Sequence, residues 1–175
     1  MELNKAKEIA AGIVAQLAPY CERIEIAGSI RRGRPEVHDI DIVCIPSGPA
    51  FYRALQGVGQ PCDNGSKIHR IALPGQVSQG KQFCADIYIA TEATWATLLL
   101  IRTGSADHNK HLCTLARQKG MRLHADGEGL ELVAKDPRDL FNQGPPVVQG
   151  AIPCRTETDI FNALGLKFKA PGERT

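Results

Sequence analysis

Two aspartates separated by a single isoleucine, Asp39 and Asp41, are the residues of this chain that best suggest chemistry. Successive side chains of a β-strand point to opposite faces, so in a strand over residues 39–45 both carboxylates would share one face. Two neighbouring carboxylates repel each other unless cations neutralise them. Magnesium takes oxygen ligands of this kind, and substrate phosphates complete its octahedral shell. The pair predicts a magnesium site, although two solvated acids on an exposed edge strand explain the same pattern equally well.

A third aspartate, Asp86, lies in a second segment that alternates in the same way. The apolar residues of 83–89 would face one side of a strand, and Asp86 would face the other. If the two strands are neighbours in one sheet, three carboxylates converge on one face. Taken alone, Asp86 is better explained as a solvated strand residue, so the prediction depends on the two strands being neighbours.

A candidate phosphate-binding loop precedes the carboxylate pair. Gly28-Ser29 follows a short alternating strand, and a glycine there lets backbone N–H groups approach a phosphate while the serine hydroxyl adds a donor. Arg31 and Arg32 add multidentate donors for triphosphate oxygens, although a solvated loop that faces DNA is an alternative for this basic run. Anion-binding groups followed by metal-binding carboxylates are what a magnesium–triphosphate complex requires.

The composition excludes some functions and selects none. Hydrophobic residues make up 43% of the chain and charged residues 23%, as in ordinary globular proteins. The net charge of +2 is too small to indicate nucleic-acid binding by itself. The six cysteines form no C-x-x-C pair and have no zinc-site spacing, so we expect reduced, structural thiols. No secretory signal or membrane-spanning apolar run is visible, so we expect a cytoplasmic protein.

The elements that must position these residues follow from apolar periodicity and from turn residues. We expect helices over 4–17, 49–55, 93–102, 105–119 and 156–164, and strands over 23–27, 39–45, 67–73 and 82–90. We expect a loop over 74–80, and Asp126-Gly127 predicts a hairpin turn. A change from strand to helix patterns near Ala90 divides the chain into a sheet-based domain over 1–90 and a smaller domain over 91–175.

The order of the motifs resembles one known family. Gly-Ser-Ile-Arg-Arg-Gly at 28–33, followed by Asp-Ile-Asp-Ile at 39–42, resembles the palm motif of family X DNA polymerases, the group of DNA polymerase β. Asp86 lies in Ala-Asp-Ile-Tyr-Ile, which is similar to the strand with that family's third carboxylate. Segments 103–105, 109–110, 158–161 and 169–174 resemble parts of the thumb. The resemblance implies an α+β fold: a nucleotidyltransferase palm, which is a mixed β-sheet with helices on one face, followed by a small helical and β thumb subdomain.

The resemblance also implies an activity, a DNA-directed DNA polymerase that adds dNMP to a primer 3′-OH in short-gap repair synthesis. One Mg²⁺ would lie between Asp39, Asp41 and the triphosphate, and a second would bind all three aspartates and the primer hydroxyl. Mn²⁺ would substitute for Mg²⁺. Asp86 would accept the hydroxyl proton or hold the group that accepts it. The partners would be gapped DNA or a primer–template and a dNTP, and we expect a monomer that does not bind membranes.

The resemblance and the chemistry together assign roles to particular residues. The catalytic and metal-binding residues would be Asp39, Asp41 and Asp86, and the nucleotide-binding residues would be Gly28, Ser29, Arg32, Gly104 and Asn109. DNA would be contacted by Lys67, Arg70, Thr103, Ser105 and Lys110, with Lys81 as a further candidate. Ordinary solubilising charge explains the residues at 67, 70 and 81 equally well.

Several positions depart from the family pattern. Arg102 belongs to an Ile-Arg pair that stands where the family has a Tyr-Phe pair under the nucleotide sugar, and Ala106 replaces an acid near the incoming base. Cys113 replaces an arginine that reaches the template strand, and Cys84 replaces an arginine beside the third carboxylate. These departures leave sugar discrimination and fidelity open.

Larger family members carry an N-terminal helix-hairpin-helix domain that binds the 5′ phosphate of a gap. Because only about twenty residues precede the palm strand, we expect a palm-and-thumb form of bacterial, prophage or viral origin, without abasic-site lyase activity. Two other functions stay open: nucleotidyl transfer to another acceptor (untemplated terminal transfer, RNA, protein or a small molecule) and non-catalytic binding of nucleic acid. The three aspartates and Gly28-Ser29 argue against non-catalytic binding.

Overall fold

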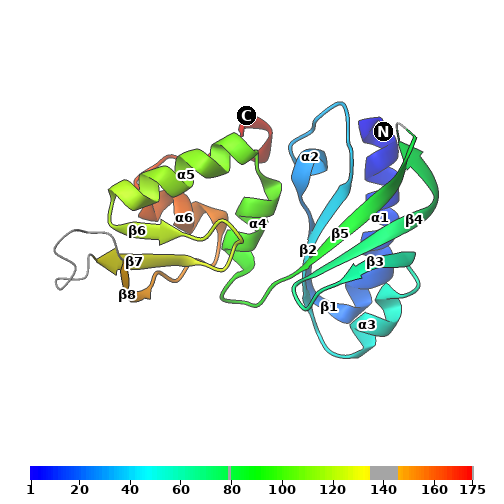
Figure 1. Ribbon diagram of the computed structural model, residues 1–175, viewed down its shortest axis with the longest axis horizontal. Coiled ribbons are helices and arrows are strands. Elements are labelled where there is room, and N and C mark those ends of the chain that lie inside the picture. The colour runs from blue at the N-terminus through cyan, green and yellow to red at the C-terminus, as the bar shows by residue number, and fades with distance from the viewer. Residues whose placement is uncertain (79, 135–145, 175) are drawn as a thin grey trace.

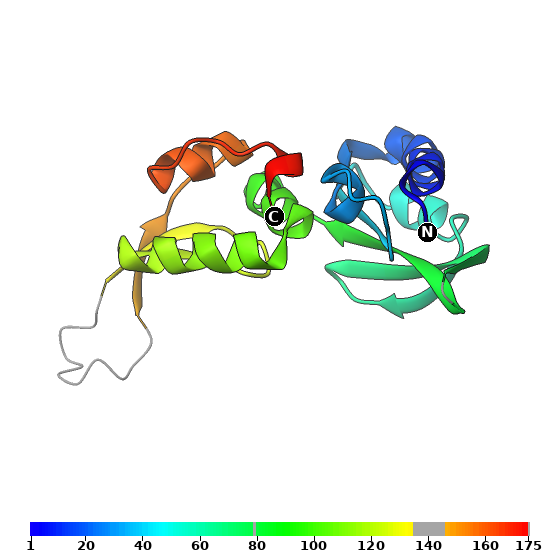
Figure 2. The same ribbon diagram turned by 90° about the horizontal axis from the view of Figure 1, so that it is seen from above.

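Two β-sheets with helices packed on them divide the molecule into an N-terminal and a C-terminal part (Figures 1 and 2). The computed structural model describes residues 1–78, 80–134 and 146–174. The N-terminal part contains α1 (Leu3–Leu17), η1 (Ala18–Tyr20), β1 (Cys21–Ile26), α2 (Gly28–Arg31), β2 (Ile40–Pro46), α3 (Ala50–Leu55), β3 (Gln60–Asn64), β4 (Ile68–Ser78) and β5 (Lys81–Ile89). The C-terminal part contains α4 (Trp95–Thr103), α5 (Ala106–Gln118), β6 (Met121–Leu123), β7 (Leu130–Ala134), β8 (Val147–Ala151), α6 (Glu157–Ala163) and η2 (Pro171–Glu173). The α+β class expected from the sequence is confirmed.

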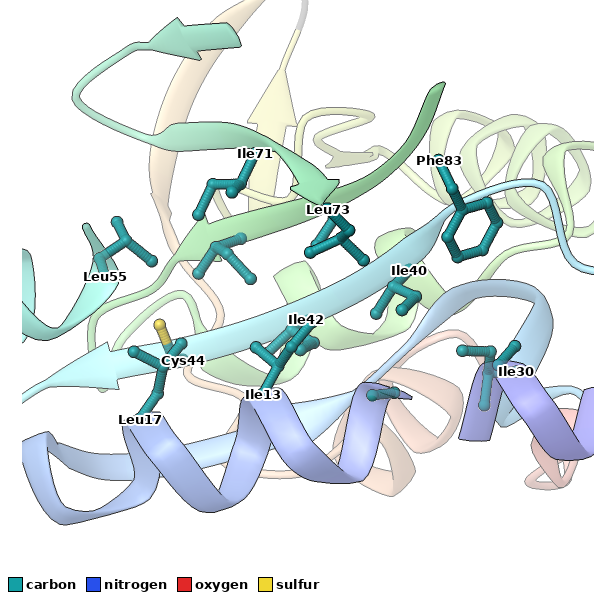
Figure 3. Packing of buried hydrophobic residues seen from close by; sticks show 14 of the residues in the cluster. Ile13, Leu17, Ile30, Ile40, Ile42, Cys44, Leu55, Ile71, Leu73 and Phe83 are labelled. Atoms are coloured by element: carbon teal, nitrogen blue, oxygen red, sulfur yellow. The ribbon is translucent and has the colours of Figure 1, made fainter. Parts of the chain in front are cut away.

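The N-terminal sheet has the strand order β1-β2-β5-β4-β3. It is mixed, because β2 and β5 run parallel while the other pairs are antiparallel. The alternation of β2 sends Ile40, Ile42 and Cys44 to the face that α1 covers, where they pack with Ile13 and Leu17 (Figure 3). Burial of these apolar side chains stabilises the part by roughly 25 cal/mol per Å² removed from water. The same alternation sends Asp41 to the opposite face.

On that opposite face, α4 packs over one end of the sheet. Trp95, Leu98 and Leu99 of α4 form a buried cluster with Val43 of β2 and Tyr88 of β5. Since side chains two apart in a strand share a face, Asp41 and Asp86 lie on this face beside the cluster. The helix therefore connects the C-terminal part to the face of the sheet that carries the two carboxylates.

The C-terminal part has its own core between a three-stranded antiparallel sheet, β6-β7-β8, and its helices. Leu100, Leu112, Leu130 and Phe161 are each no more than 1% exposed at its centre. Ser105 caps α5 by accepting a hydrogen bond from the His108 backbone N–H, as a serine at this position commonly does. The chain's last described residues return to lie between the two parts, close to α2 (Figures 1 and 2).

The structure differs from the expected elements in four places. The segment 74–80 was expected to be a loop, but β4 continues to Ser78 and β5 begins at Lys81; Gln79 lies outside the described residues. The phosphate loop includes a short helix, α2, and neither β3 nor β8 was predicted. Asp126-Gly127 does turn the chain between β6 and β7, with Gly127 at φ +91°. Within the described ranges, none of the helices combines the length and the apolar character needed to span a bilayer.

Candidate active site

Asp41 and Asp86 are direct neighbours on two adjacent parallel strands. The register of β2 and β5 pairs residue 41 with residue 86. The two strands are therefore neighbours, as the predicted convergence of the carboxylates requires. Asp39 stands one residue before the start of β2. Burial, followed by the negative charges of Asp39 and Asp86, raises the pKa of Asp41 to about 7. The carboxylates thus form one electrostatic unit that would favour a bound cation.

Tyr88 connects the two neighbouring carboxylates. Its hydroxyl donates to Asp41 Oδ1 at 3.2 Å, and a longer contact of 3.5 Å reaches Asp86 Oδ2. Burial and the charge of Asp41 raise the pKa of Tyr88, so the phenol remains a donor near neutral pH. The Arg102 guanidinium lies 4.3 Å from the centre of the Tyr88 ring, in a cation–π contact. Tyr88 and Arg102 were not predicted as site residues, because their contacts join separate elements.

Asp86 is also held by an arginine from the next strand. Arg70 Nε donates to Asp86 Oδ1 and Arg70 Nη2 donates to Asp86 Oδ2, each at 2.8 Å. The antiparallel register of β4 and β5 places these two residues opposite each other. Arg70 was predicted to contact DNA phosphate, but here two of its donors engage a carboxylate.

The predicted phosphate loop lies against the carboxylates. The Ala27 N–H donates to the Asp41 carbonyl at 2.8 Å, which fixes the start of the loop on β2. Gly28 follows with φ +58°, and a Cβ there would meet Asp41 Oδ2 at 1.9 Å. Ser29 Oγ is buried and has no hydrogen-bond partner. Glycine at 28 is therefore required both by the backbone conformation and by the approach of Asp41.

The two arginines after this loop reach the C-terminal part, along a line of contacts that we call the seam (Arg31, Arg32, Thr103, Glu157, Arg174). Arg32 Nη1 donates to the Thr103 carbonyl. Arg31 donates to the Thr103 hydroxyl at 2.8 Å and makes two bonds to Glu157, at 2.9 and 2.8 Å. Arg174, which is fully buried, donates to Glu157 Oε1 at 2.6 Å. Burial alone would raise the pKa of Glu157, but the hydrogen bonds from both arginines outweigh it and lower the pKa.

The turn between α4 and α5 faces the loop across the seam. Gly104 has φ +73°, and a Cβ there would lie 2.9 Å from Arg32 Nη1. Asn109 donates through Nδ2 to the Ile101 carbonyl at 2.7 Å, while its Oδ1 has no partner. Of the predicted nucleotide-binding residues, the structure therefore places Gly28 against Asp41 and Gly104 against Arg32.

The predicted DNA contacts are more dispersed. Thr103 is buried and accepts from Arg31, and Ser105 is used as the helix cap. Lys67 and Lys110 are exposed and pair with Glu128 and Asp107. The side chain of Lys81 lies outside the described ones. Among the described side chains, Thr103, Ser105, Lys67 and Lys110 each contact a different partner.

Several polar atoms of the described residues are buried without a hydrogen-bond partner. In the described part of the chain, Ser29 Oγ, Arg32 Nε, Arg102 Nε and Asn109 Oδ1 are buried without a hydrogen-bond partner. Such atoms are uncommon in folded proteins, because each costs desolvation energy with no return. Ser29 and Arg32 belong to α2 and its C-cap, Arg102 to the last turn of α4, and Asn109 to the first turn of α5. A polar ligand could satisfy such atoms.

The donor set fits a hard divalent cation. Carboxylate oxygens are the ligands that Mg²⁺ and Mn²⁺ prefer, and the pKa of Asp41 is raised by burial and by the negative charges of Asp39 and Asp86, which a cation would offset. As the side chains stand, no three His, Cys, Asp or Glu residues among those described form a ready coordination cluster. Arg70 neutralises Asp86 in this arrangement.

Comparison with known proteins relates this site to a family. Residues 98–175 match the family described as DNA polymerase beta thumb. The chain is 29% identical over 170 residues to DNA polymerase lambda of Rattus norvegicus, covering 84% of this chain and 28% of that protein. It is 28% identical over 131 residues to the DNA polymerase/3′-5′ exonuclease PolX of Bacillus subtilis (strain 168), covering 71% of this chain and 22% of that protein.

The fold has a solved relative as well. The crystal structure of Leishmania infantum polymerase beta, a ternary P/T complex, superposes with a TM-score of 0.74 at 20% identity, over 100% of this chain and 76% of that one. The chain thus spans less than a third of the length of the two curated relatives, and most of the solved one. The resemblance read from the motifs is confirmed: the chain is similar to family X DNA polymerases and shares the α+β fold of polymerase beta.

Proposed function

We propose that this chain is a DNA polymerase of family X type that transfers dNMP from a dNTP to a primer 3′-OH in short gaps of DNA. Residues 1–90 would act as the palm and residues 91–175 as the thumb. The single observation that carries the proposal is the register of Asp41 with Asp86 beside a loop whose Gly28 touches Asp41. An acidic pair in contact with a phosphate-binding loop is suited to a metal-bound triphosphate.

Asp39, Asp41 and Asp86 would hold two Mg²⁺ ions, with Mn²⁺ as a substitute. When bound, the metal would lower the pKa of the primer hydroxyl and offset the charge of the phosphates. The 3′ oxygen then attacks the α-phosphorus, the bond to pyrophosphate breaks, and the hydroxyl proton passes to Asp86.

The remaining residues would orient the substrates. Ser29 Oγ and the unpartnered Arg32 Nε would bind the β- and γ-phosphates. Asn109 Oδ1 would accept a hydrogen bond from the incoming base. Lys110 and Lys67, both exposed, would contact DNA phosphates. Binding by these groups would hold the reacting atoms in line, which is the main protein contribution to phosphoryl transfer.

The experiment is extension of a labelled primer in a one-nucleotide gap with Mg²⁺ and each dNTP in turn. Extension only by the template-matched nucleotide supports the proposal. Untemplated addition would make the protein a terminal transferase. Absence of extension on gapped, recessed and single-stranded primers would direct the search to another acceptor.

A further inference from the structure

Arg70 lies where it can control the orientation of the third carboxylate. Its two hydrogen bonds to Asp86, both 2.8 Å, use different nitrogens and different oxygens, so the guanidinium and the carboxylate meet side on. This paired geometry fixes both groups more closely than a single bond could. The cross-strand register of β4 and β5 holds the two backbones directly opposite each other.

The two side chains differ in their exposure. The Asp86 side chain is 9% exposed and the Arg70 side chain is 49% exposed. A buried carboxylate next to Asp41 needs a directly bonded cation, whereas an arginine on the open face does not need a partner. The contact therefore matters more to Asp86 than to Arg70. Among the described residues, no other Lys or Arg is hydrogen-bonded to Asp86.

The same geometry argues against a role for Arg70 in binding DNA. A phosphate contact would have to compete with Asp86 for the side-on edge of the guanidinium. The neutral pair would also contribute little to the counterion release that drives binding to DNA.

We propose that Arg70 is a positioning residue, which holds Asp86 in the orientation needed for nucleotidyl transfer and serves as its resident counter-ion. The expected effect on kcat rests on the proposed function, whereas the role of Arg70 as counter-ion of Asp86 does not. Without Arg70, Asp86 would be free to turn away from the reacting atoms and would lack a bonded cation.

Position 84 offers an independent way to supply the missing group. Cys84 precedes Asp86 by two residues on β5, so both side chains lie on the same face, and Cys84 pairs with Ala72 of β4. An arginine at 84 could extend along the strand to Asp86. The double variant R70A/C84R therefore moves the guanidinium from one strand to the next while keeping its partner.

The kinetic experiment compares wild type, R70A, R70A/C84R and, as a matched control, R53A, which removes an exposed arginine from α3 on the other side of the sheet. We expect R70A to lower kcat by about 10–100-fold, as loss of an orienting partner does, with dNTP KM and DNA Kd within about twofold. R70A/C84R should recover at least half of the decrease in log kcat caused by R70A. Weaker DNA binding with unchanged kcat would overturn the proposal.

A second readout does not need activity. Thermal unfolding is measured with and without Mn²⁺ for the same proteins. Because Mn²⁺ replaces a counter-ion that R70A has lost, its stabilising shift should be at least twice as large in R70A as in wild type, and R70A/C84R should return to the wild-type value. Equal shifts in wild type and R70A would overturn the proposal, even if wild type extends no primer and the proposed function itself has failed. If R70A does not fold, R70Q and R70Q/C84R replace it, since glutamine removes the charge while keeping a polar side chain of similar length.

Discussion

Gly28 lies directly against Asp41, so that an ideal Cβ on the glycine would come within 1.9 Å of the carboxylate Oδ2. The glycine also has φ +58°, a conformation that other residues adopt only with strain. Two physical reasons thus require glycine at this position, one from the backbone and one from the site. A second glycine in the same loop allows the two reasons to be separated.

Replacing Gly28 by alanine should displace Asp41 and lower nucleotidyl transfer by about 10²-fold, the effect expected of a misplacement near 1 Å. The matched control is Gly33→Ala, because Gly33 has φ +71° but open space where its Cβ would lie. Gly33→Ala should cost roughly 1 kcal/mol of stability and retain most activity. Primer extension and urea unfolding measure both. Equal loss of activity in the two variants would assign the effect to backbone strain alone.

The pKa of Asp41, about 7, makes the stability of the metal-free protein depend on pH. A carboxyl whose pKa is raised on folding stabilises the folded state at low pH, and this contribution is lost as pH rises from about 4 to about 7. Asp41→Asn removes the charge, so at pH 8 without metal it should be more stable than wild type, by at most about 4 kcal/mol. The difference should shrink toward pH 4.

The control for this series is Asp63→Asn, an exposed aspartate on β3. Its difference from wild type should stay small at every pH. Urea unfolding of the metal-free proteins between pH 4 and 8 gives the curves. A constant difference between Asp41→Asn and wild type across that range would contradict the electrostatic description of the carboxylates.

The seam should be a major source of stability. Glu157→Gln removes the one charge that two arginines share, and Arg174 is fully buried. Breaking a buried ion pair by removing one partner costs about 3–5 kcal/mol. Glu92→Gln is the control, because its pair with Arg23 is exposed and 3.8 Å long, and such pairs contribute about 0–1 kcal/mol. If the urea midpoints of both variants moved equally, the seam would contribute no more to stability than an exposed ion pair.

Arg32 is predicted to bind the triphosphate. Arg32→Ala should weaken dNTP binding by roughly 1.5–3 kcal/mol for each charge-assisted hydrogen bond lost. Arg34→Ala, from the same basic run, is the matched control and should change dNTP affinity much less. Titrations of dNTP and of DNA measure the two affinities. Unchanged dNTP affinity with lost DNA affinity would move Arg32 to the DNA surface.

The carboxylate pair could be predicted from the sequence because strand alternation is a local property. Asp41 and its apolar neighbours in β2 show a two-residue period, and so do Asp86 and its neighbours in β5. Whether β2 and β5 are neighbours depends on the whole sheet. From the sequence, convergence of the carboxylates could therefore be predicted only on the assumption that the two strands pair. The resemblance to family X polymerases supported this assumption, and β2 and β5 do pair in the structure.

The partners of the arginines could not be predicted in this way. Arg31 and Glu157 are 126 residues apart, and Arg70 and Asp86 come from strands whose pairing the sequence does not specify. Arg70 was expected either to contact DNA or to be ordinary solubilising charge, because its partner Asp86 becomes visible only through the pairing of β4 with β5. The segment 74–80 was expected to be a loop because Pro74 and Gly75 are typical of turns, but pairing with β5 continues to Ser78.

We propose that Asp39, Asp41 and Asp86 drive metal-dependent nucleotidyl transfer. Single-turnover extension of a primer in a one-nucleotide gap, by wild type and by Asp41→Asn with Mg²⁺, tests it most directly. We expect wild type to add the template-matched nucleotide and Asp41→Asn to be slower by about 10³-fold, since a metal ligand supplies several kcal/mol to the transition state. Circular dichroism should show the same fold for both. Extension by Asp41→Asn at nearly the wild-type rate would show that the chemistry takes place elsewhere.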